Sequence, residues 1–166
     1  MPPTDQNMPD VEGLYRQHGG ALLLFAISIC GESSRAQDAV HQVFLKLIET
    51  GGIKNALDPK AYLFASVRNN LLNDQKSRQR NVPIDADRLW FEAPDRDHAA
   101  EENLRRALQA LPDDQRQVVV LHIWGELTFS QVAEILSISA NTAASRYRYA
   151  LAKLREAMLV KESSNA

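Results

Sequence analysis

The stretch LTFSQVAEILSISANTAASRYRYALAKLREAM, residues 127–158, decides the fold of the C-terminal part of the chain. Thr128 is followed three residues later by Gln131, the spacing of a capping box at a helix start. Apolar residues then recur at helical intervals, namely Phe129, Val132, Ala133 and Leu136. The turn Ser137-Ile138-Ser139 follows, with Ser139 placed to cap a second helix. The pattern predicts two helices joined by a tight turn.

The second predicted helix has two chemically different sides at about 100° per residue. The apolar side comprises Ala143, Tyr147, Ala150, Leu151, Leu154 and Met158. The other side comprises Asn141, Thr142, Ser145, Arg148 and Tyr149, and further basic residues are Arg146, Lys153 and Arg155. Such a pair of helices is typical of the helix-turn-helix, which places its second helix in the DNA major groove. Taken alone, an ordinary helical hairpin with a solvated basic face is the better explanation.

Length and charge distribution indicate how the rest of the chain is organised. With 166 residues and 45% hydrophobic content, the chain has material for one ordinary domain or two small ones. The net charge of −2 is uninformative, but residues 60–80 and 140–166 are basic and residues 81–103 are acidic. Two basic segments on either side of an acidic one indicate two anion-binding faces.

The side-chain chemistry argues against a metal centre or an enzyme. Cys30 is the single cysteine and the four histidines lack metal-ligand spacing, so we expect no disulfide, no metal and no cofactor. A Gly-rich phosphate loop and a Ser/His/acid grouping are both missing from the sequence, which argues against a hydrolase or another enzyme. The apolar run at residues 21–30 is too short to cross a bilayer, so we expect a cytoplasmic protein without membrane insertion.

Two further helices are predicted before residue 55, and the second has a distinct polar side. The first has an apolar stripe from Val11 and ends at Gly31, and the second begins at Ser33 or Ser34 and ends at Gly51. The predicted core stripe of the second is Val40, Val43, Phe44, Leu47 and Ile48. Its other face carries Asp38, His41, Gln42, Leu45 and Glu49. From the pattern alone, that face is simply solvated.

Asp58-Pro59 marks the start of a third helix, because an N-cap residue precedes a proline at the first helical position. Its predicted buried residues are Tyr62, Leu63, Val67 and Leu71, with Phe64 beside them. Its polar residues are Arg68, Asn69, Asn73, Lys76, Arg78 and Arg80. Basic side chains neutralise phosphates and asparagine reads base edges, so this face suits nucleic acid; a solvated basic tail is the simpler alternative.

The C-terminal half begins after a segment punctuated by prolines. Residues 81–103 are predicted to be a flexible acidic linker, within which Leu89-Trp90-Phe91 has no evident role. A short helix follows over Leu104 to Leu111, and Pro112 begins another that ends at Gly125. We therefore predict an all-α chain with two small helical domains, residues 10–80 and 104–160, the second a helix-turn-helix, and tails at 1–9 and 161–166.

These residues together resemble the extracytoplasmic-function (ECF) group of sigma-70-type RNA polymerase sigma factors, over nearly the whole chain. AQDAVHQVFLKLIE at 36–49 is similar to the family helix that binds the polymerase clamp. The resemblance implies that core polymerase is contacted by Asp38, His41, Gln42 and Leu45. The family more often has Gln-Glu where this chain has His41-Gln42.

Two other segments extend the resemblance to promoter DNA. AYLFASVRNNLLNDQKSRQR at 61–80 is similar to the helix that captures and melts the −10 element, with Tyr62 where tryptophan is usual. The implied −10 contacts are Arg68, Asn69, Asn73, Lys76, Arg78 and Arg80. Residues 107–155 are similar to the family's C-terminal domain, and the implied −35 contacts are Asn141, Thr142, Ser145, Arg146, Arg148 and Tyr149. Ala144 and Leu151 replace residues that are usually basic, which predicts weaker binding to the −35 DNA.

The resemblance implies a sigma factor with a region 2-like domain at 10–80, a region 4-like domain at 104–160, and no enzymatic activity. Its expected partners are the clamp and flap of core RNA polymerase, promoter DNA and an anti-sigma factor. The alternative is a conventional helix-turn-helix regulator whose N-terminal domain mediates interactions. That alternative predicts a stable dimer on palindromic DNA, whereas a sigma factor binds DNA weakly until polymerase is added.

Overall fold

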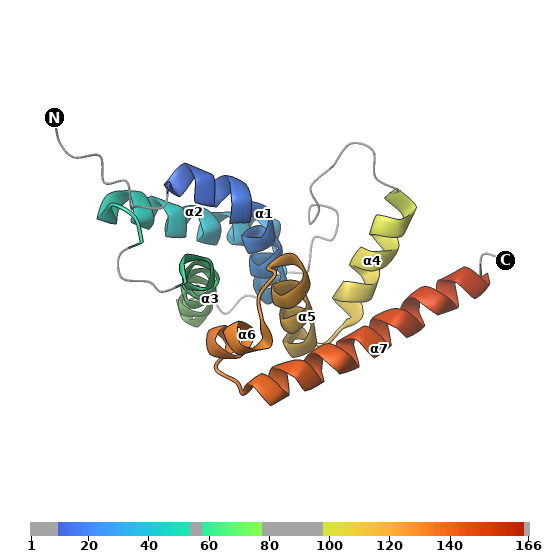
Figure 1. Ribbon diagram of the computed structural model, residues 1–166. Helices are drawn as coiled ribbons and strands as arrows, with labels where there is room; N and C mark the ends of the chain where they lie inside the picture. Colours follow the sequence, from blue (N-terminus) through green and yellow to red (C-terminus); the bar gives the residue numbers. More distant parts are fainter. Residues whose placement is uncertain (1–9, 54–57, 78–97, 165–166) are drawn as a thin grey trace. The chain divides into compact units, whose positions relative to one another are not determined.

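The computed structural model describes residues 10–53, 58–77 and 98–164, and the chain divides into two compact units, residues 1–89 and 90–166 (Figure 1). Every regular element within the described residues is a helix, so the all-α prediction is confirmed. Arg78, Arg80 and the Leu89-Trp90-Phe91 segment lie outside the described residues.

The first unit contains α1 (Val11–Cys30), α2 (Ser33–Thr50) and α3 (Pro59–Ser77), and each packs against the other two. The predicted helix ends are confirmed. Gly31 and Gly51 adopt the left-handed conformation that ends α1 and α2, with φ of 72° and 84°. Asp58 caps α3, because its Oδ1 accepts a hydrogen bond from the Ala61 N–H at 3.2 Å.

Two aromatic rings lie at the centre of the first unit's core. Phe25 of α1 and Phe64 of α3 are fully buried, with ring centroids 5.7 Å apart. The prediction that Ile48 is a core residue was wrong, because its side chain is 63% exposed. Ile48 lies about 90° from the centre of the buried stripe of α2, beyond the reach of the neighbouring helices. Tyr62 was also expected to be buried but is 46% exposed, on the side of α3 away from Leu63 and Val67.

The second unit contains α4 (His98–Ala110), α5 (Asp113–Val119), η2 (Val120–Trp124), α6 (Phe129–Leu136) and α7 (Ala140–Ser164). Helical structure extends further than the sequence predicted at both ends. α4 begins inside the range 81–103 that was expected to be linker, and α7 continues to Ser164, into the expected tail at 161–166. The apolar spacing that placed these helices begins at Leu104 and ends by Val160, so it did not reveal the extensions, although Asp97, an N-cap residue type, directly precedes His98.

The predicted helix from Pro112 to Trp124 forms, but its last five residues, η2, wind as a wider π-helical turn. The Gly125 N–H donates to the Val120 carbonyl at 3.0 Å, and the Leu127 N–H donates to the Leu121 carbonyl at 3.2 Å. A Cβ atom at Gly125 would collide with the Leu121 carbonyl oxygen, so only glycine fits. This turn directs the chain from α5 into the helix-turn-helix.

Arg116 of α5 connects the first two helices of the second unit. Its guanidinium donates to the carbonyls of Leu108 at 2.9 Å, Gln109 at 3.1 Å and Leu111 at 2.8 Å. These carbonyls lie at the C-terminal end of α4 and just after it, where the regular helical hydrogen bonds stop. A buried cluster from α4, α5 and α7 lies beside this connection and comprises Ala107, Leu108, Leu111, Val119, Ala150 and Leu154.

Candidate nucleic-acid interface

The helix-turn-helix forms with the caps that its sequence predicts. Thr128 Oγ1 accepts from the Gln131 N–H at 3.2 Å while Gln131 Oε1 accepts from the Thr128 N–H at 2.8 Å, which completes the capping box. Ser139 Oγ accepts from the Thr142 N–H at 3.0 Å and caps α7. Ser137 takes the left-handed conformation in the turn, with φ of 57°. Short-range hydrogen bonds thus fix where α7 begins.

Three aromatic rings hold α7 to the preceding helices, an arrangement that sequence reasoning missed. His122 of η2 stacks on Phe129 of α6 with centroids 4.3 Å apart, and it meets Tyr147 of α7 edge-on at 4.6 Å. His122 Nδ1 lies 2.8 Å from the Leu127 carbonyl oxygen, so this nitrogen carries the proton and donates it. His122 therefore connects η2 to both helices of the helix-turn-helix.

The outer side of α7 presents polar groups to solvent. Asn141, Arg148 and Tyr149 are exposed, the last at 66%, and Thr142 and Ser145 are partly exposed. The Arg148 guanidinium donates to Ser145 Oγ at 3.3 Å, which aligns two of these side chains along the helix. The opposite side is buried at Ala143, Ala150 and Leu154.

Arg146 differs from Arg148 in its surroundings. Its side chain is 30% exposed, and its Nε lies 3.5 Å from Oδ2 of Asp114 on α5. The structure thus brings five of the six predicted −35 residues to a solvent-facing surface and pairs the sixth with a neighbouring helix. The neighbouring carboxylate, that of Asp113, pairs with a different arginine: its Oδ1 lies 3.1 Å from Nη1 of Arg116.

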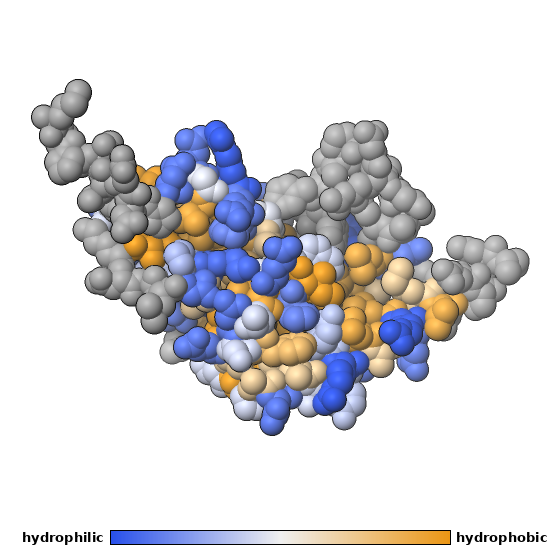
Figure 2. All heavy atoms as spheres, in the orientation of Figure 1, coloured by the Kyte–Doolittle hydropathy of each residue, from blue (hydrophilic) through white to orange (hydrophobic). Residues whose placement is uncertain are grey.

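An apolar groove of about 490 Å³ lies between α4, η2 and α7. Figure 2 shows hydrophobic residues gathered in this part of the second unit. The groove is lined by Leu104, Ile123, Trp124, Leu151, Leu154, Arg155, Met158 and Leu159. Leu151, which replaces a usually basic residue, lines this groove instead of the outer side of α7. Sequence reasoning missed the groove, because its walls come from segments distant in the chain.

The polar side of α2 is exposed as predicted at Asp38, His41, Gln42 and Leu45. Ile48 lies one turn beyond Leu45 on the same helix and adds a second exposed apolar side chain. Gln42 is also engaged within the unit, because its Oε1 accepts a hydrogen bond from Asn70 Nδ2 of α3 at 2.9 Å. The face therefore combines an acidic group, amides and apolar side chains.

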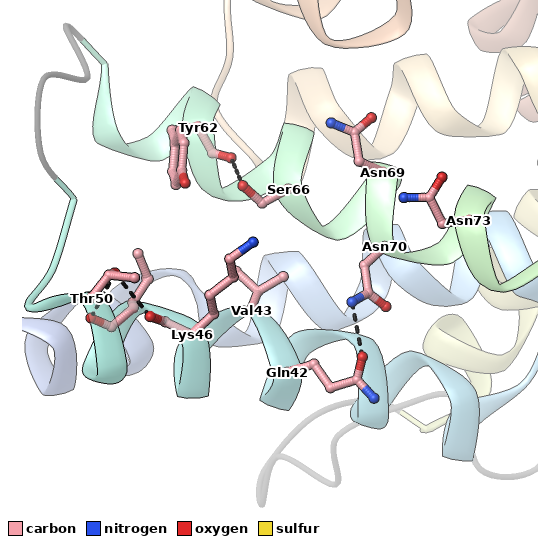
Figure 3. Close-up of a pocket in the computed structure, with 10 residues that line it drawn as sticks. Gln42, Val43, Lys46, Thr50, Tyr62, Ser66, Asn69, Asn70 and Asn73 are labelled. Carbon is pink, nitrogen blue, oxygen red and sulfur yellow. Dashed lines mark hydrogen bonds between the residues drawn. The ribbon is translucent and has the colours of Figure 1, made fainter.

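A polar groove of about 300 Å³ separates α2 from α3 (Figure 3). Asn69 and Asn73 line it from successive turns of α3, together with Tyr62 at one end and Lys46 from α2. Sequence reasoning identified the two asparagines but missed Lys46, Ser66 and Asn70, whose role depends on the packing of α2 on α3. Arg68 is partly buried and does not line the groove, and the structure describes no side chain for Lys76.

The described residues contain no group of histidine, cysteine, aspartate and glutamate side chains that would hold a metal ion. None of the helices in the described part of the chain is long and apolar enough to span a membrane. Burial raises the pKa of the Cys30 thiol above its ordinary value, and this effect outweighs the lowering by a backbone hydrogen bond of Glu32.

Comparisons with known proteins agree with this geometry. Residues 101–154 match the family described as sigma-70, region 4. The chain is 30% identical over 166 residues to the ECF RNA polymerase sigma factor EcfG of Rhodopseudomonas palustris, covering 96% of this chain and 89% of that one. It is 28% identical to the ECF sigma factor SigL of Mycobacterium tuberculosis, covering 87% and 86%.

A solved structure is similar over most of its length. The sigma factor RpoE from Bartonella quintana, crystallised with the anti-sigma factor NepR, superposes with a TM-score of 0.69 at 25% identity, covering 90% of this chain and 96% of that one. The chain therefore belongs to the ECF family of RNA polymerase sigma factors. As a sigma factor it directs promoter-specific transcription initiation, and sigma factors are not catalysts by themselves.

Proposed function

We propose that this sigma factor divides promoter recognition between its two units. Residues 104–160 bind the −35 element, and residues 10–80 bind core polymerase and the −10 element. The observation that carries the proposal is the outer side of α7. Its polar side chains face solvent while caps at Thr128 and Ser139 and the ring of His122 fix the helix from behind. A rigid helix with an exposed polar face is what major-groove recognition requires.

Asn141, Arg148 and Tyr149 make the −35 contacts at the exposed centre of this face, with Thr142 and Ser145 beside them. Arginine pairs bidentately with guanine and asparagine with adenine, so these side chains discriminate bases. Arg148→Ala should change the −35 preference at one or two positions by about 1–3 kcal/mol. A uniform loss over all sequences would make Arg148 a phosphate contact instead. Arg16→Ala, which removes an exposed arginine of α1, is the matched control.

The α2 face formed by Asp38, His41, Gln42 and Leu45 docks on the clamp of core polymerase. Asp38 is exposed on a helix whose other side is buried, so its charge can be reversed without disturbing the core. Asp38→Arg should abolish co-purification with core polymerase while the far-UV circular dichroism spectrum stays unchanged. Glu134→Arg, an exposed charge reversal on α6, should retain it. Unchanged association of Asp38→Arg would remove this face from the interface.

The groove between α2 and α3 receives the unpaired −10 strand. Asn69 and Asn73 offer amides to base edges, Tyr62 offers an exposed ring for stacking, and Lys46 supplies a positive charge. Arg68, Lys76, Arg78 and Arg80 supply phosphate contacts along and beyond α3. Asn69→Ala should therefore weaken binding of holoenzyme to a pre-melted promoter and lower the permanganate reactivity of the −10 thymines on a duplex promoter. Unchanged binding to the pre-melted promoter would contradict a reading role.

The apolar groove of the second unit fits a helix from the polymerase flap, and an anti-sigma factor is a further expected partner. Support for the latter is the structural similarity to RpoE, which was crystallised with one. The part of the predicted acidic linker that precedes α4 is expected to thread polymerase channels that otherwise hold nucleic acid. All of these partners place the protein in the cytoplasm.

Run-off transcription with core polymerase, this chain and a genomic promoter pool tests the proposal as a whole. Discrete transcripts that depend on both proteins are the expected result. A stable dimer that binds palindromic DNA without polymerase would instead identify a conventional helix-turn-helix regulator. Sequencing the transcripts' start sites also supplies the promoter for the binding experiments below.

A further inference from the structure

The ion pair between Arg146 and Asp114 joins the recognition helix α7 to α5. Arg146 Nε lies 3.5 Å from Asp114 Oδ2, and the two side chains are 30% and 52% exposed. The carboxylate is itself held in place, because Asp114 Oδ1 accepts the Gln115 N–H at 2.9 Å. The orientation of the pair is thus set from the α5 side, and the arginine of α7 follows it.

Arg146 lies at the border of the outer side of α7. At about 100° per residue it is roughly 140° from Asn141 and therefore close to the buried side formed by Ala143 and Ala150. Those two residues are small and apolar, and Ala150 packs in the cluster that contains Val119 of α5. On this side of α7 the rotation is restrained by Tyr147, which packs on His122 and Phe129, and by Arg146. The ion pair between Arg146 and Asp114 attracts α7 to α5 at one angle around the helix, in addition to the ring contacts of Tyr147.

We infer that Arg146 is a positioning residue, which Asp114 holds so that α7 presents Asn141, Arg148 and Tyr149 at the correct rotation. The inference rests on the proposed −35 role of α7 and changes the expectation that Arg146 itself contacts DNA. A guanidinium that bound a DNA phosphate would bring the Asp114 carboxylate close to the same phosphate. The repulsion between the two anions would then oppose binding.

Exchanging the two charges separates positioning from DNA contact. The experiment uses full-length protein in holoenzyme and measures its affinity for a duplex carrying the promoter identified by run-off transcription, at several KCl concentrations. A second duplex with a scrambled −35 element gives the specificity ratio. The variants are Arg146→Ala, Asp114→Ala and the double exchange Arg146→Asp with Asp114→Arg. Asp113→Ala, which removes the neighbouring carboxylate, is the matched control.

Each alanine variant should lower the specificity ratio by a similar factor, roughly twofold to fivefold, as expected for a partly exposed ion pair. The salt dependence of the affinity for the promoter duplex should be the same in the alanine variants as in the wild type. The double exchange should restore the specificity ratio to within about twofold of the wild type. Restoration also shows that the double exchange folds, because a misfolded helix-turn-helix would not regain specificity, and the far-UV circular dichroism spectrum checks the fold of the alanine variants.

Three results would overturn the inference. The first is a salt slope reduced by about one in Arg146→Ala, which indicates a phosphate contact. The second is tighter binding by Asp114→Ala, which indicates that the carboxylate merely competes with DNA for the arginine. The third is a double exchange that binds worse than either alanine variant. If wild-type holoenzyme binds the promoter and the scrambled duplex equally well, the proposed function is wrong as well. If the wild type discriminates between them but the double exchange does not restore the specificity ratio, only the inference is wrong.

Discussion

Replacing Arg116 should destabilise the second unit more than any exposed substitution in it. Arg116 is 14% exposed and donates three hydrogen bonds to carbonyls at the end of α4, while its ion-pair partner Asp113 is 79% exposed. In Arg116→Met the aliphatic volume is largely kept but all of these hydrogen bonds are lost. The variant therefore isolates the polar connection between α4 and α5.

The size of the effect follows from the hydrogen bonds and not from the ion pair. A hydrogen bond to a charged group contributes about 1.5–3 kcal/mol, but water replaces part of it at a half-open helix end. The loss of all three should therefore cost about 2–4 kcal/mol in total. The pair with the exposed Asp113 should contribute less than about 1 kcal/mol. Arg116→Lys should lie between, because one ammonium cannot reach three carbonyls in the geometry of a guanidinium.

Hydrogen exchange followed by mass spectrometry, with peptides covering residues 104–124, measures this effect separately from the first unit. Peptides from α4 and α5 in Arg116→Met should exchange faster by the factor equivalent to the lost free energy, while peptides from α1 to α3 stay unchanged. Asp113→Ala is the control and should leave exchange nearly unaltered. Equal acceleration in Arg116→Met and Asp113→Ala would refute the reasoning, because it would make the exposed ion pair the source of stability.

Three further predictions concern single positions. Gly125→Ala should destabilise the second unit by about 1–3 kcal/mol in urea unfolding, because the new methyl group meets the Leu121 carbonyl; an unchanged midpoint would contradict this. His122→Phe should lose about 1 kcal/mol with the hydrogen bond to Leu127, and His122→Ala should lose more because the stacking on Phe129 goes too; equal losses would show that stacking contributes nothing. Cys30 should react with iodoacetamide at pH 8 more slowly in the folded protein than in urea, because burial raises its pKa. That raised pKa adds stability that is present below the unfolded thiol's pKa and lost as pH rises through the folded one. Equal alkylation rates in both states would exclude the effect.

Parts of the candidate interface could be predicted because their signals are local. Thr128 with Gln131, Ser139 and Asp58 cap helices within three residues of themselves, so spacing alone identified them. The polar sides of α2 and α7 followed from helical periodicity, which is also local. Ile48 and Tyr62 were misassigned because an apolar residue at the edge of a stripe is buried only if a neighbouring helix reaches it. The sequence contains no local signal that shows whether a neighbouring helix contacts such a residue.

The amino-acid sequence by itself determined the all-α fold, the helix-turn-helix and the family, because helix caps, helical periodicity and the order of the motifs can be recognised from the residue types and their spacing. Tertiary packing alone decided which groups meet. It placed His122 between Phe129 and Tyr147, directed Leu151 into an apolar groove, joined Gln42 to Asn70, and paired Arg146 with Asp114. These contacts link residues from different helices, and their distances depend on how the helices pack rather than on the spacing of residues along any one of them.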